Sequence, residues 1–252
     1  MIVLVVGSFL VLDGLVSNVI DSLSERFATQ QVRYDQGRTL NPLLQEIALA
    51  RKLARSPAVI DWALDEENTV KAARGLAELE SFREIFKDGS YFFAIHNSGH
   101  YFFNDAANGY AGKQLRYTLL PDQDKDAWYY ATVKNPVECQ LNVNNDSELQ
   151  VTKIWINCLV KDNGKVVGVI GTGIELTKFI RAVLDAHQDG VWNMFIDGNG
   201  AIQAHPDVNQ IDYHTLTKDA GEKNTVYRLL SNDQSRSRLK AILEKLKSAP
   251  LD

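Results

Sequence analysis

The sequence has no run rich in Lys or Arg, and its 27 basic residues are outnumbered by 32 acidic ones. A protein that binds the phosphates of nucleic acid needs a basic face, so the net charge of -5 argues against nucleic acid as a partner. With 252 residues, of which 45% are hydrophobic, the chain is long enough for one large globular domain or two small ones.

Cysteine is also scarce, since Cys139 and Cys158 are the only two in the chain. Neither belongs to a CxxC motif or has a histidine beside it, which argues against a metal site. We expect two isolated buried thiols on opposite arms of one predicted hairpin. A disulfide formed in an oxidising compartment is the alternative.

Motifs of catalysis and nucleotide binding are absent as well. No Ser/His/Asp or Cys/His arrangement stands out, and no pair of carboxylates has a motif spacing. Gly168, Gly171 and Gly173 lie within a predicted strand and match no phosphate-binding loop. His205 has no second ligand at a metal-site spacing. The sequence therefore predicts no catalytic residue, no cofactor and no metal.

The hydrophobic run at residues 1–12 is too short to span a bilayer, which takes about 20 apolar residues. It is not a signal peptide, because no Lys or Arg precedes Arg26. We interpret it as the outer end of a transmembrane helix, with the residues beyond it on the non-cytoplasmic side. A buried N-terminal core helix is the alternative.

The first third of the chain has mostly helical periodicity. A narrow apolar stripe, formed by Leu15, Val19, Leu23 and Phe27, suits pairing between two parallel copies or packing on the same chain. Gly37, Asn41 and Pro42 predict a kink or break. Further helices are expected at 43–54, 56–64 and 69–86.

From Tyr91 the pattern becomes that of a sheet. Residues 91–103 predict an aromatic hairpin, and the polar residues 105–125 predict a long lid loop. Residues 126–134 are expected to be helical or turn-like. Three more strands are expected, at 138–143, 149–160 and 165–176, with a turn at 144–147 and another at 162–164.

Alternation along the second of these strands places Lys153, Trp155 and Asn157 on one face. A cation, an indole and an amide in a row are typical of a ligand pocket, in which a few polar groups orient a small molecule. Trp128 and Tyr129 can close over the same sheet. Thr172, between two glycines that allow close approach of a ligand, is a further candidate. A solvated sheet face is the alternative.

A series of features in chain order resembles the double Cache (dCache) sensor domain, which is built from PAS-like modules. The series is a membrane-emergent helix, the aromatic hairpin, the Trp128-Tyr129 pair, the turn at 161–165, the Gly-Thr-Gly-Ile-Glu-Leu end of a strand at 171–176, and a hairpin at 197–207. The resemblance runs from about residue 13 to the end. It implies an α+β fold with a long N-terminal helix and tandem PAS-like modules with antiparallel sheets.

This resemblance implies four parts, namely the end of a transmembrane helix at 1–12, a helical region at 13–87, a membrane-distal ligand-binding module at 88–186, and a membrane-proximal module at 187–252. The second module is expected to be incomplete and the chain truncated. The family forms the extracytoplasmic part of bacterial chemoreceptors, histidine kinases and diguanylate cyclases. The expected partners are a small organic carboxylate or amine, the bacterial inner membrane, and a second copy in a parallel homodimer.

The family's amino-acid-binding pattern is only partly present. Its Trp-Tyr pair is matched by Trp128 and Tyr129, but Asp126 replaces the expected Arg, and Gly173 replaces the expected Asp. Lys153 is the substitute partner that we expect for a carboxylate, and Asp126 or Glu175 for an amine. The lid residues Arg116 and Tyr110 are further candidates. The competing hypothesis is a ligandless ectodomain that serves as a structural or protein-interaction module.

Overall fold

The structure is a computed structural model that describes residues 40–146, 151–184 and 193–248, without 215 and 220, and some residues between 19 and 37. The chain divides into two compact units, Met1–Leu44 and Gln45–Asp252. The predicted end of a transmembrane helix, at 1–12, lies outside the described residues. Among the helices that the structure describes, none is both long enough and apolar enough to span a bilayer.

The described residues between 19 and 37 are helical. Val19, Leu23 and Phe27 are each more than half exposed, at 55%, 60% and 51%. The described side chains of the predicted stripe are therefore exposed. Of the residues at which a break is predicted, Gly37 is π-helical, and Asn41 and Pro42 are the first residues of α2 (Asn41–Ala54).

Two more helices begin and end close to the positions that the sequence predicts. Pro57 takes the first position of α3 (Pro57–Leu64), where its missing N–H costs nothing. Asn68 caps α4 (Thr69–Ile85), because its side chain accepts hydrogen bonds from the N–H groups of Val70 and Lys71.

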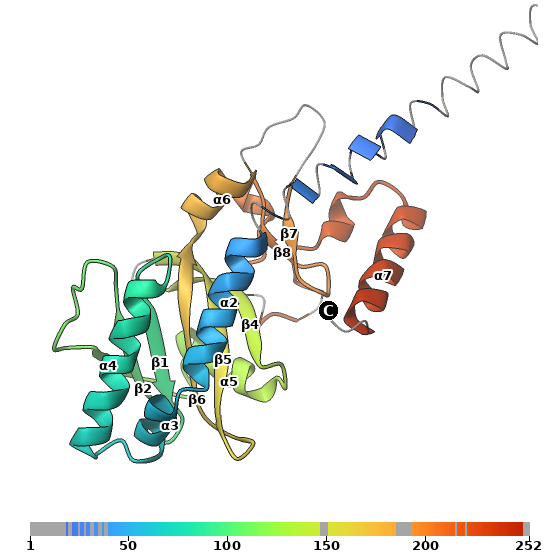
Figure 1. Cartoon of the computed structure of the whole chain (residues 1–252). Helices are drawn as coiled ribbons and strands as arrows, with labels where there is room; N and C mark the ends of the chain where they lie inside the picture. The colour runs from blue at the N-terminus through green and yellow to red at the C-terminus, as the bar shows by residue number, and fades with distance from the viewer. Residues whose placement is uncertain are drawn as a thin grey trace, which may run out of the picture. The chain divides into compact units, whose positions relative to one another are not determined.

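The core of the second unit is a six-stranded antiparallel sheet (Figure 1). Its strands follow the order β3-β2-β1-β6-β5-β4. Their bounds are β1 (Tyr91–Ile95), β2 (His100–Asn104), β3 (Leu115–Thr118), β4 (Cys139–Asp146), β5 (Val151–Asp162) and β6 (Lys165–Glu175). The short helix η2 (Asp124–Asp126) and α5 (Ala127–Lys134) precede β4. The predicted hairpin turn at 162–164 is present, with positive φ at Asn163 and Gly164.

Two predictions about this sheet are wrong in detail. The expected lid loop at 105–125 contains β3, whose partly exposed residues suit the sheet edge where it pairs with β2. The expected turn at 144–147 begins too early, because Asn144 continues β4 and pairs with Lys153. A cluster of asparagines resembles a turn in sequence, but cross-strand pairing overrides that preference here.

The two faces of the sheet have different neighbours. One face packs on helices, since Trp62 of α3 lies 5.4 Å from the ring of Phe93 and 4.8 Å from that of Phe102. The other face carries an aromatic cluster that includes Phe92, Tyr101 and Trp155, against which Trp128 of α5 packs. The alternation predicted for β5 is therefore correct.

Cys139 and Cys158 form a disulfide between directly opposed residues of β4 and β5. The expectation of two isolated thiols is wrong, although their placement on opposite arms of one hairpin is correct. Sequence spacing alone does not reveal that two residues face each other across a ladder. The bridge fixes β4 to the sheet at its first residue.

A smaller segment of the second unit follows β6. It contains α6 (Leu176–Leu184), β7 (Phe195–Ile196), β8 (Ile202–Ala204), η3 (Val208–Gln210), η4 (Val226–Leu229) and α7 (Asp233–Ser248). Ala204 and Ile211 join a buried cluster with Val143 of β4 and Leu176 of α6. His214 also donates its backbone N–H to the carbonyl oxygen of Val143, at 2.9 Å.

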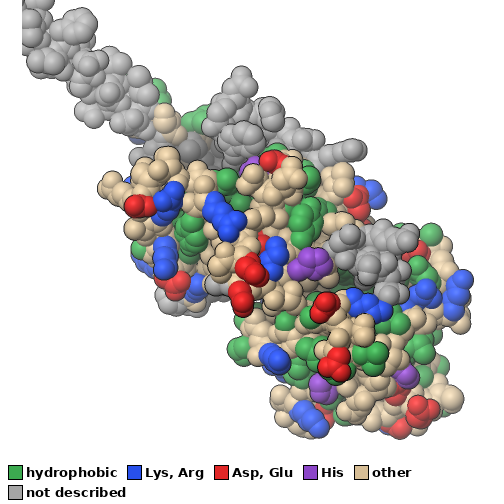
Figure 2. All heavy atoms as spheres, turned by 180° about the vertical axis from the view of Figure 1, so that it is seen from behind, with side chains coloured by type: hydrophobic (Ala, Val, Ile, Leu, Met, Phe, Trp, Pro, Cys, Tyr) green, Lys and Arg blue, Asp and Glu red, His purple; other side chains and the backbone are tan. Residues whose placement is uncertain are grey.

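Acidic and basic side chains are interspersed over one face of the molecule (Figure 2). On the described part of that face, no continuous basic area is seen. This distribution fits the acidic net charge of the whole sequence.

Candidate ligand-binding site

The candidate site is a pocket on the face of the sheet that carries the aromatic cluster. It is lined by four aromatic residues from β1, β2, α5 and β5 and by three asparagines from β4 and β5, namely Phe92, Tyr101, Trp128, Trp155, Asn142, Asn144 and Asn157. The strand register explains how these residues meet. Phe92 pairs with Gly171, which pairs with Asn157, and Trp155 pairs with Asn142.

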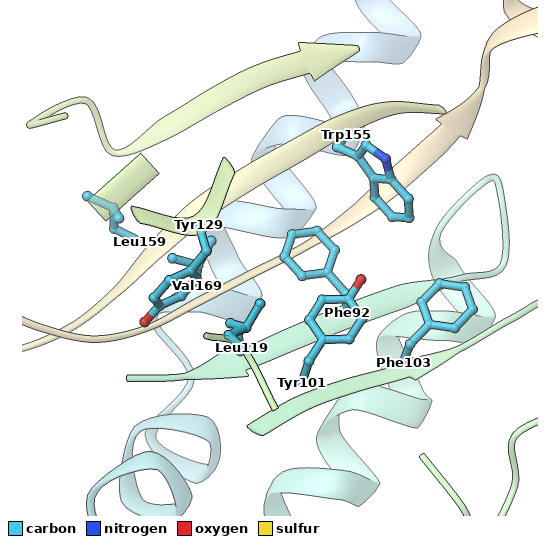
Figure 3. Close-up of a cluster of buried hydrophobic side chains, with 9 residues drawn as sticks. Phe92, Tyr101, Phe103, Leu119, Tyr129, Trp155, Leu159 and Val169 are labelled. Atoms are coloured by element: carbon cyan, nitrogen blue, oxygen red, sulfur yellow. The ribbon is translucent and has the colours of Figure 1, made fainter. Parts of the chain in front are cut away.

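Aromatic rings form the walls of the pocket. Figure 3 shows three of these residues, Phe92, Tyr101 and Trp155, within the buried cluster. The ring of Phe92 lies 5.6 Å from the rings of both Trp128 and Trp155, at interplanar angles of 87° and 83°. Trp128 also meets Tyr101 edge to face, at 6.2 Å. Such edge-to-face pairs are favourable and hold the rings in defined positions.

The asparagines supply polar groups without partners. Asn142 and Asn157 are only 2% and 1% exposed. Both side-chain polar atoms of Asn157, and the Oδ1 atoms of Asn142 and Asn144, have no hydrogen-bond partner among the described residues. Each such buried group costs about 1–3 kcal/mol when it is left unpaired. This cost calls for a functional explanation, and a bound polar molecule provides one.

The pocket is narrow in this conformation. Its cavity volume is about 10 Å³, which is room for about one water molecule. A larger ligand therefore requires Trp128 or another wall residue to move.

The structure brings three of the residues predicted from sequence, Trp128, Trp155 and Asn157, into this pocket. Tyr129, the neighbour of Trp128, lies outside it. Figure 3 shows Tyr129 beside Leu159 and Val169, apart from Trp155. Its hydroxyl lies 2.9 Å from Nδ1 of His96, and burial raises the pKa of the phenol.

Lys153 shares the pocket's face of β5 but is engaged elsewhere. Its ammonium group forms an ion pair with the carboxylate of Asp88 and a hydrogen bond with the hydroxyl of Ser90, at 3.1 Å. Its Nζ atom lies 5.5 Å from the centre of the Trp155 ring, beside the pocket wall. Thr172 lies on the opposite face by register, where its hydroxyl donates to the backbone carbonyl of Ser90.

The three remaining predicted residues also have partners in the protein. Asp126 is fully buried, and its Oδ2 accepts the N–H of Leu120 at 2.8 Å. The guanidinium group of Arg116 lies 4.1 Å from the centre of the Tyr110 ring. Tyr110 packs edge to face on Phe103, at 5.5 Å. Asp126, Arg116 and Tyr110 therefore shape the segments around the pocket without lining it.

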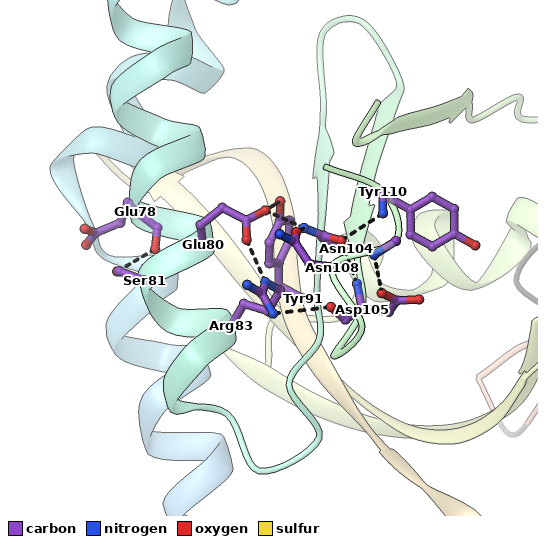
Figure 4. Close-up of polar contacts among 10 residues, drawn as sticks. Glu78, Glu80, Ser81, Arg83, Tyr91, Asn104, Asp105, Asn108 and Tyr110 are labelled. Carbon is purple, nitrogen blue, oxygen red and sulfur yellow. Dashed lines mark hydrogen bonds and ion pairs between the residues drawn. The ribbon is translucent and has the colours of Figure 1, made fainter. Parts of the chain in front are cut away.

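A polar network fixes the start of the loop that follows β2 (Figure 4). Oδ1 of Asn104 accepts the N–H groups of Asp105 and Tyr110, and its amide donates to Glu80 of α4. Although burial alone raises the pKa of Glu80, hydrogen bonds from Arg83, Asn104 and Tyr91 lower it below its ordinary value. The loop is thus anchored to α4 through a carboxylate that stays ionised.

Sequence reasoning missed Phe92, Tyr101, Asn142 and Asn144 as pocket residues. The signal for the asparagines was present, because every second residue from Gln140 to Asn144 is an amide. Alternate residues of a strand share one face, so this pattern predicts a polar face. The aromatic residues carry no such signal, since any strand of a core contains similar residues.

No protein-family model matches the chain. Solved structures, however, share its fold. The ligand-binding domain of the Pseudomonas fluorescens chemoreceptor CtaA, in complex with L-alanine, is 18% identical with a TM-score of 0.54, and the match covers 82% of this chain and 78% of that chain. The chain has the fold of a Cache-type sensor domain.

Two further Cache-fold matches come from other chemoreceptors. The ligand-binding domain of the Pseudomonas aeruginosa PAO1 amino acid chemoreceptor PctC, in complex with GABA, is 16% identical with a TM-score of 0.53, covering 75% of this chain and 79% of that chain. The sensory domain of the Campylobacter jejuni chemoreceptor Tlp3 is 17% identical with a TM-score of 0.52, covering 72% and 71%. The predicted α+β fold class is confirmed.

Proposed function

We propose that this chain is the extracytoplasmic sensor domain of a bacterial signal-transduction receptor and that it binds a small organic molecule in the pocket described above. The observation that carries the proposal is the set of buried, unpaired carboxamide groups between aromatic walls. Solved domains of similar fold are in complex with small molecules such as L-alanine and GABA, which supports a ligand in this chain as well.

The disulfide supports the extracytoplasmic location. Disulfides persist in oxidising compartments such as the periplasm and are rare in the cytosol. The bridge between Cys139 and Cys158 lies in the strand pair that carries the asparagines. We therefore place the domain in the periplasm or outside the cell, anchored in the inner membrane through the N-terminal helix.

Signalling is proposed to pass through the N-terminal helix of a parallel homodimer. The exposed side chains of Val19, Leu23 and Phe27 recur every four residues and form a narrow apolar seam. A matching seam on a second copy would bury them. Ligand binding would then shift the population between two arrangements of the paired helices and so reach a kinase, cyclase or other effector.

The pocket favours binding without chemical change. None of its seven described lining residues is a carboxylate, a histidine, a lysine or a cysteine, so the lining offers no nucleophile paired with a base. A non-enzymatic sensor segment is the proposal that fits this lining.

One observation favours the alternative of a ligandless interaction module, namely that the pocket now has room for about one water molecule. A thermal-shift screen separates the two functions. Small carboxylates, amines, amino acids, amides and purines would be tested on the purified chain, on Trp128→Ala, and on Tyr34→Ala as the exposed aromatic control.

A ligand at 100 times its Kd adds about 2.7 kcal/mol of stability, which corresponds to roughly 5 °C or more in a chain of this size. We expect at least one compound to produce such a shift in the native chain and in Tyr34→Ala but not in Trp128→Ala. Equal shifts in all three proteins, or none in a folded native chain across every class, would favour the ligandless module.

A further inference from the structure

The pocket is polar without being charged. Asn142 and Asn157 are more than nine-tenths buried and present unpaired carboxamide atoms beside the aromatic walls. A carboxamide offers a donor and an acceptor side by side, in one plane. Asn157 leaves both its donor and its acceptor unpaired, so it can pair with an amide edge of a ligand. The unpaired Oδ1 atoms of Asn142 and Asn144 can each accept a further N–H donor of the same ligand.

Each charged residue predicted for the site is engaged by the protein itself. Lys153 pairs with Asp88, and its stem passes beside Gly173, where it fills the space that a side chain would take. The carboxylate of Glu175 accepts the N–H groups of Thr177 and Lys178 at the start of α6. None of the described residues that line the pocket is charged. An ion held by this described lining would lose its hydration without meeting an opposite charge, which is strongly unfavourable.

The aromatic walls of the pocket favour a planar ligand. Phe92, Trp128 and Trp155 present ring faces and edges at close to right angles around the pocket. Aromatic rings of this kind stack on flat heterocycles, while asparagine side chains pair with the donor–acceptor edge of such rings. The aromatic rings therefore favour a flat ligand, and the asparagines favour one whose edge carries both a donor and an acceptor.

Resting on the ligand-binding function proposed above, we infer that the ligand is an uncharged planar molecule with an amide-type edge, such as a carboxamide or a nucleobase. An amino acid, whose carboxylate and ammonium groups each require a counter-charge, does not match this lining. The chain thus differs in ligand class from a pocket built around charged anchors.

Matched probes test the inference. Calorimetric titration of the purified chain would compare nicotinamide with nicotinate, which has the same ring but carries a carboxylate, and would include adenine, uracil, L-alanine and GABA. We expect an uncharged probe to bind at least tenfold more tightly than its charged counterpart. Trp128→Ala should abolish that binding.

A second variant links the binding to the asparagines. Asn157→Leu removes both unpaired polar atoms while nearly keeping the volume of the side chain. We expect it to weaken binding of the uncharged probe at least tenfold and to leave the midpoint of urea unfolding unchanged or higher, because an unsatisfied buried amide is lost. Gln234→Leu, which replaces an exposed amide on α7, should change neither quantity.

The outcomes separate the inference from the proposed function. If L-alanine, GABA or nicotinate binds as tightly as the uncharged probes, and Trp128→Ala abolishes that binding, the sensor function stands and the inferred ligand class is wrong. If no probe of either kind binds the folded chain, the inferred class is wrong as well, and the wider thermal-shift screen then decides the function. Unchanged binding in Asn157→Leu would also overturn the inference.

Discussion

Gly173 leaves the space that the side chain of Lys153 occupies, since a Cβ atom at position 173 would lie only 2.5 Å from Cδ of Lys153. The same Cβ would lie 3.0 Å from Cε3 of Trp155. The glycine thus permits both the path of the lysine and the position of a pocket wall. The absence of a side chain at 173 therefore lets Lys153 reach Asp88, with which it forms an ion pair.

Gly173→Ala is predicted to destabilise the chain. The added methyl group must displace Lys153 or Trp155, and overpacking of this kind costs about 1–3 kcal/mol. The free energy of unfolding in urea measures the loss. Gly221→Ala is the matched control, because nothing lies within 4 Å of a Cβ there, and it should change stability by less than about 0.5 kcal/mol.

A double-mutant cycle tests the cause of that loss. If Lys153 is the obstacle, Gly173→Ala should cost less in a Lys153→Ala background than in the native chain. Equal costs in the two backgrounds would show that Trp155 or the backbone, and not Lys153, resists the methyl group.

Asp88→Asn is predicted to lower the free energy of unfolding by about 3–5 kcal/mol, because it leaves the ammonium group of Lys153 without its counter-charge in a nearly buried position. Asp65→Asn provides the comparison, since the Asp65–Lys71 pair is largely exposed and screened by solvent, so its loss should have little effect on stability. Chemical denaturation at pH 7 measures both. If Asp88→Asn lowers the free energy of unfolding as little as Asp65→Asn does, water already screens the Asp88–Lys153 pair.

Glu80→Gln is predicted to destabilise the chain by about 1–2 kcal/mol at pH 7, because charge-assisted hydrogen bonds from Arg83, Asn104 and Tyr91 are weakened. The pKa of Glu80 is lowered in the folded chain, so its stabilising effect is complete above the ordinary value of 4.5 and is lost as the pH falls through the folded value. The difference in the free energy of unfolding between Glu80→Gln and the native chain, measured with urea, should therefore shrink from pH 7 towards pH 3.

Glu84→Gln is the control for that series, because Glu84 lies on the same helix and is exposed. It should show little difference from the native chain at any pH. A constant difference between Glu80→Gln and the native chain down to pH 3 would contradict the role given to the carboxylate.

Removal of the disulfide is predicted to cost about 2–4 kcal/mol, the usual contribution of a native bridge. The double variant Cys139→Ala/Cys158→Ala should lose this amount in urea unfolding. A reducing agent should bring the native chain to a similar stability and leave the variant unchanged. Insensitivity of the native chain to reduction, with both thiols shown to be free, would mean that the bridge adds no stability.

Much of the fold was predictable because local signals determine it. Pro57 marks the start of α3, the change of period at Tyr91 marks the first strand, and Asn163-Gly164 marks a tight turn. The edge strand β3 was missed because its exposed residues need no hydrophobic pattern. The strand continuation at Asn144 was missed because asparagine also favours turns.

The site was less predictable because its chemistry depends on distant pairings. The alternation of β5 identified Trp155 and Asn157, which line the pocket. Nothing near Lys153 in the sequence indicates that Asp88, 65 residues earlier, neutralises it. The opposed cysteines and the amides of β4 likewise depend on the register between strands, which a single sequence does not reveal.

The strand β4 has a different partner on each of its faces. Asn142 and Asn144 line the pocket, whereas Val143 between them packs with Ala204 and Ile211, and its carbonyl oxygen accepts the N–H of His214. A rotation of β4 about its own axis would therefore move the amides and the support of the C-terminal segment in opposite directions. β4 therefore connects the pocket directly to the segment that follows β6.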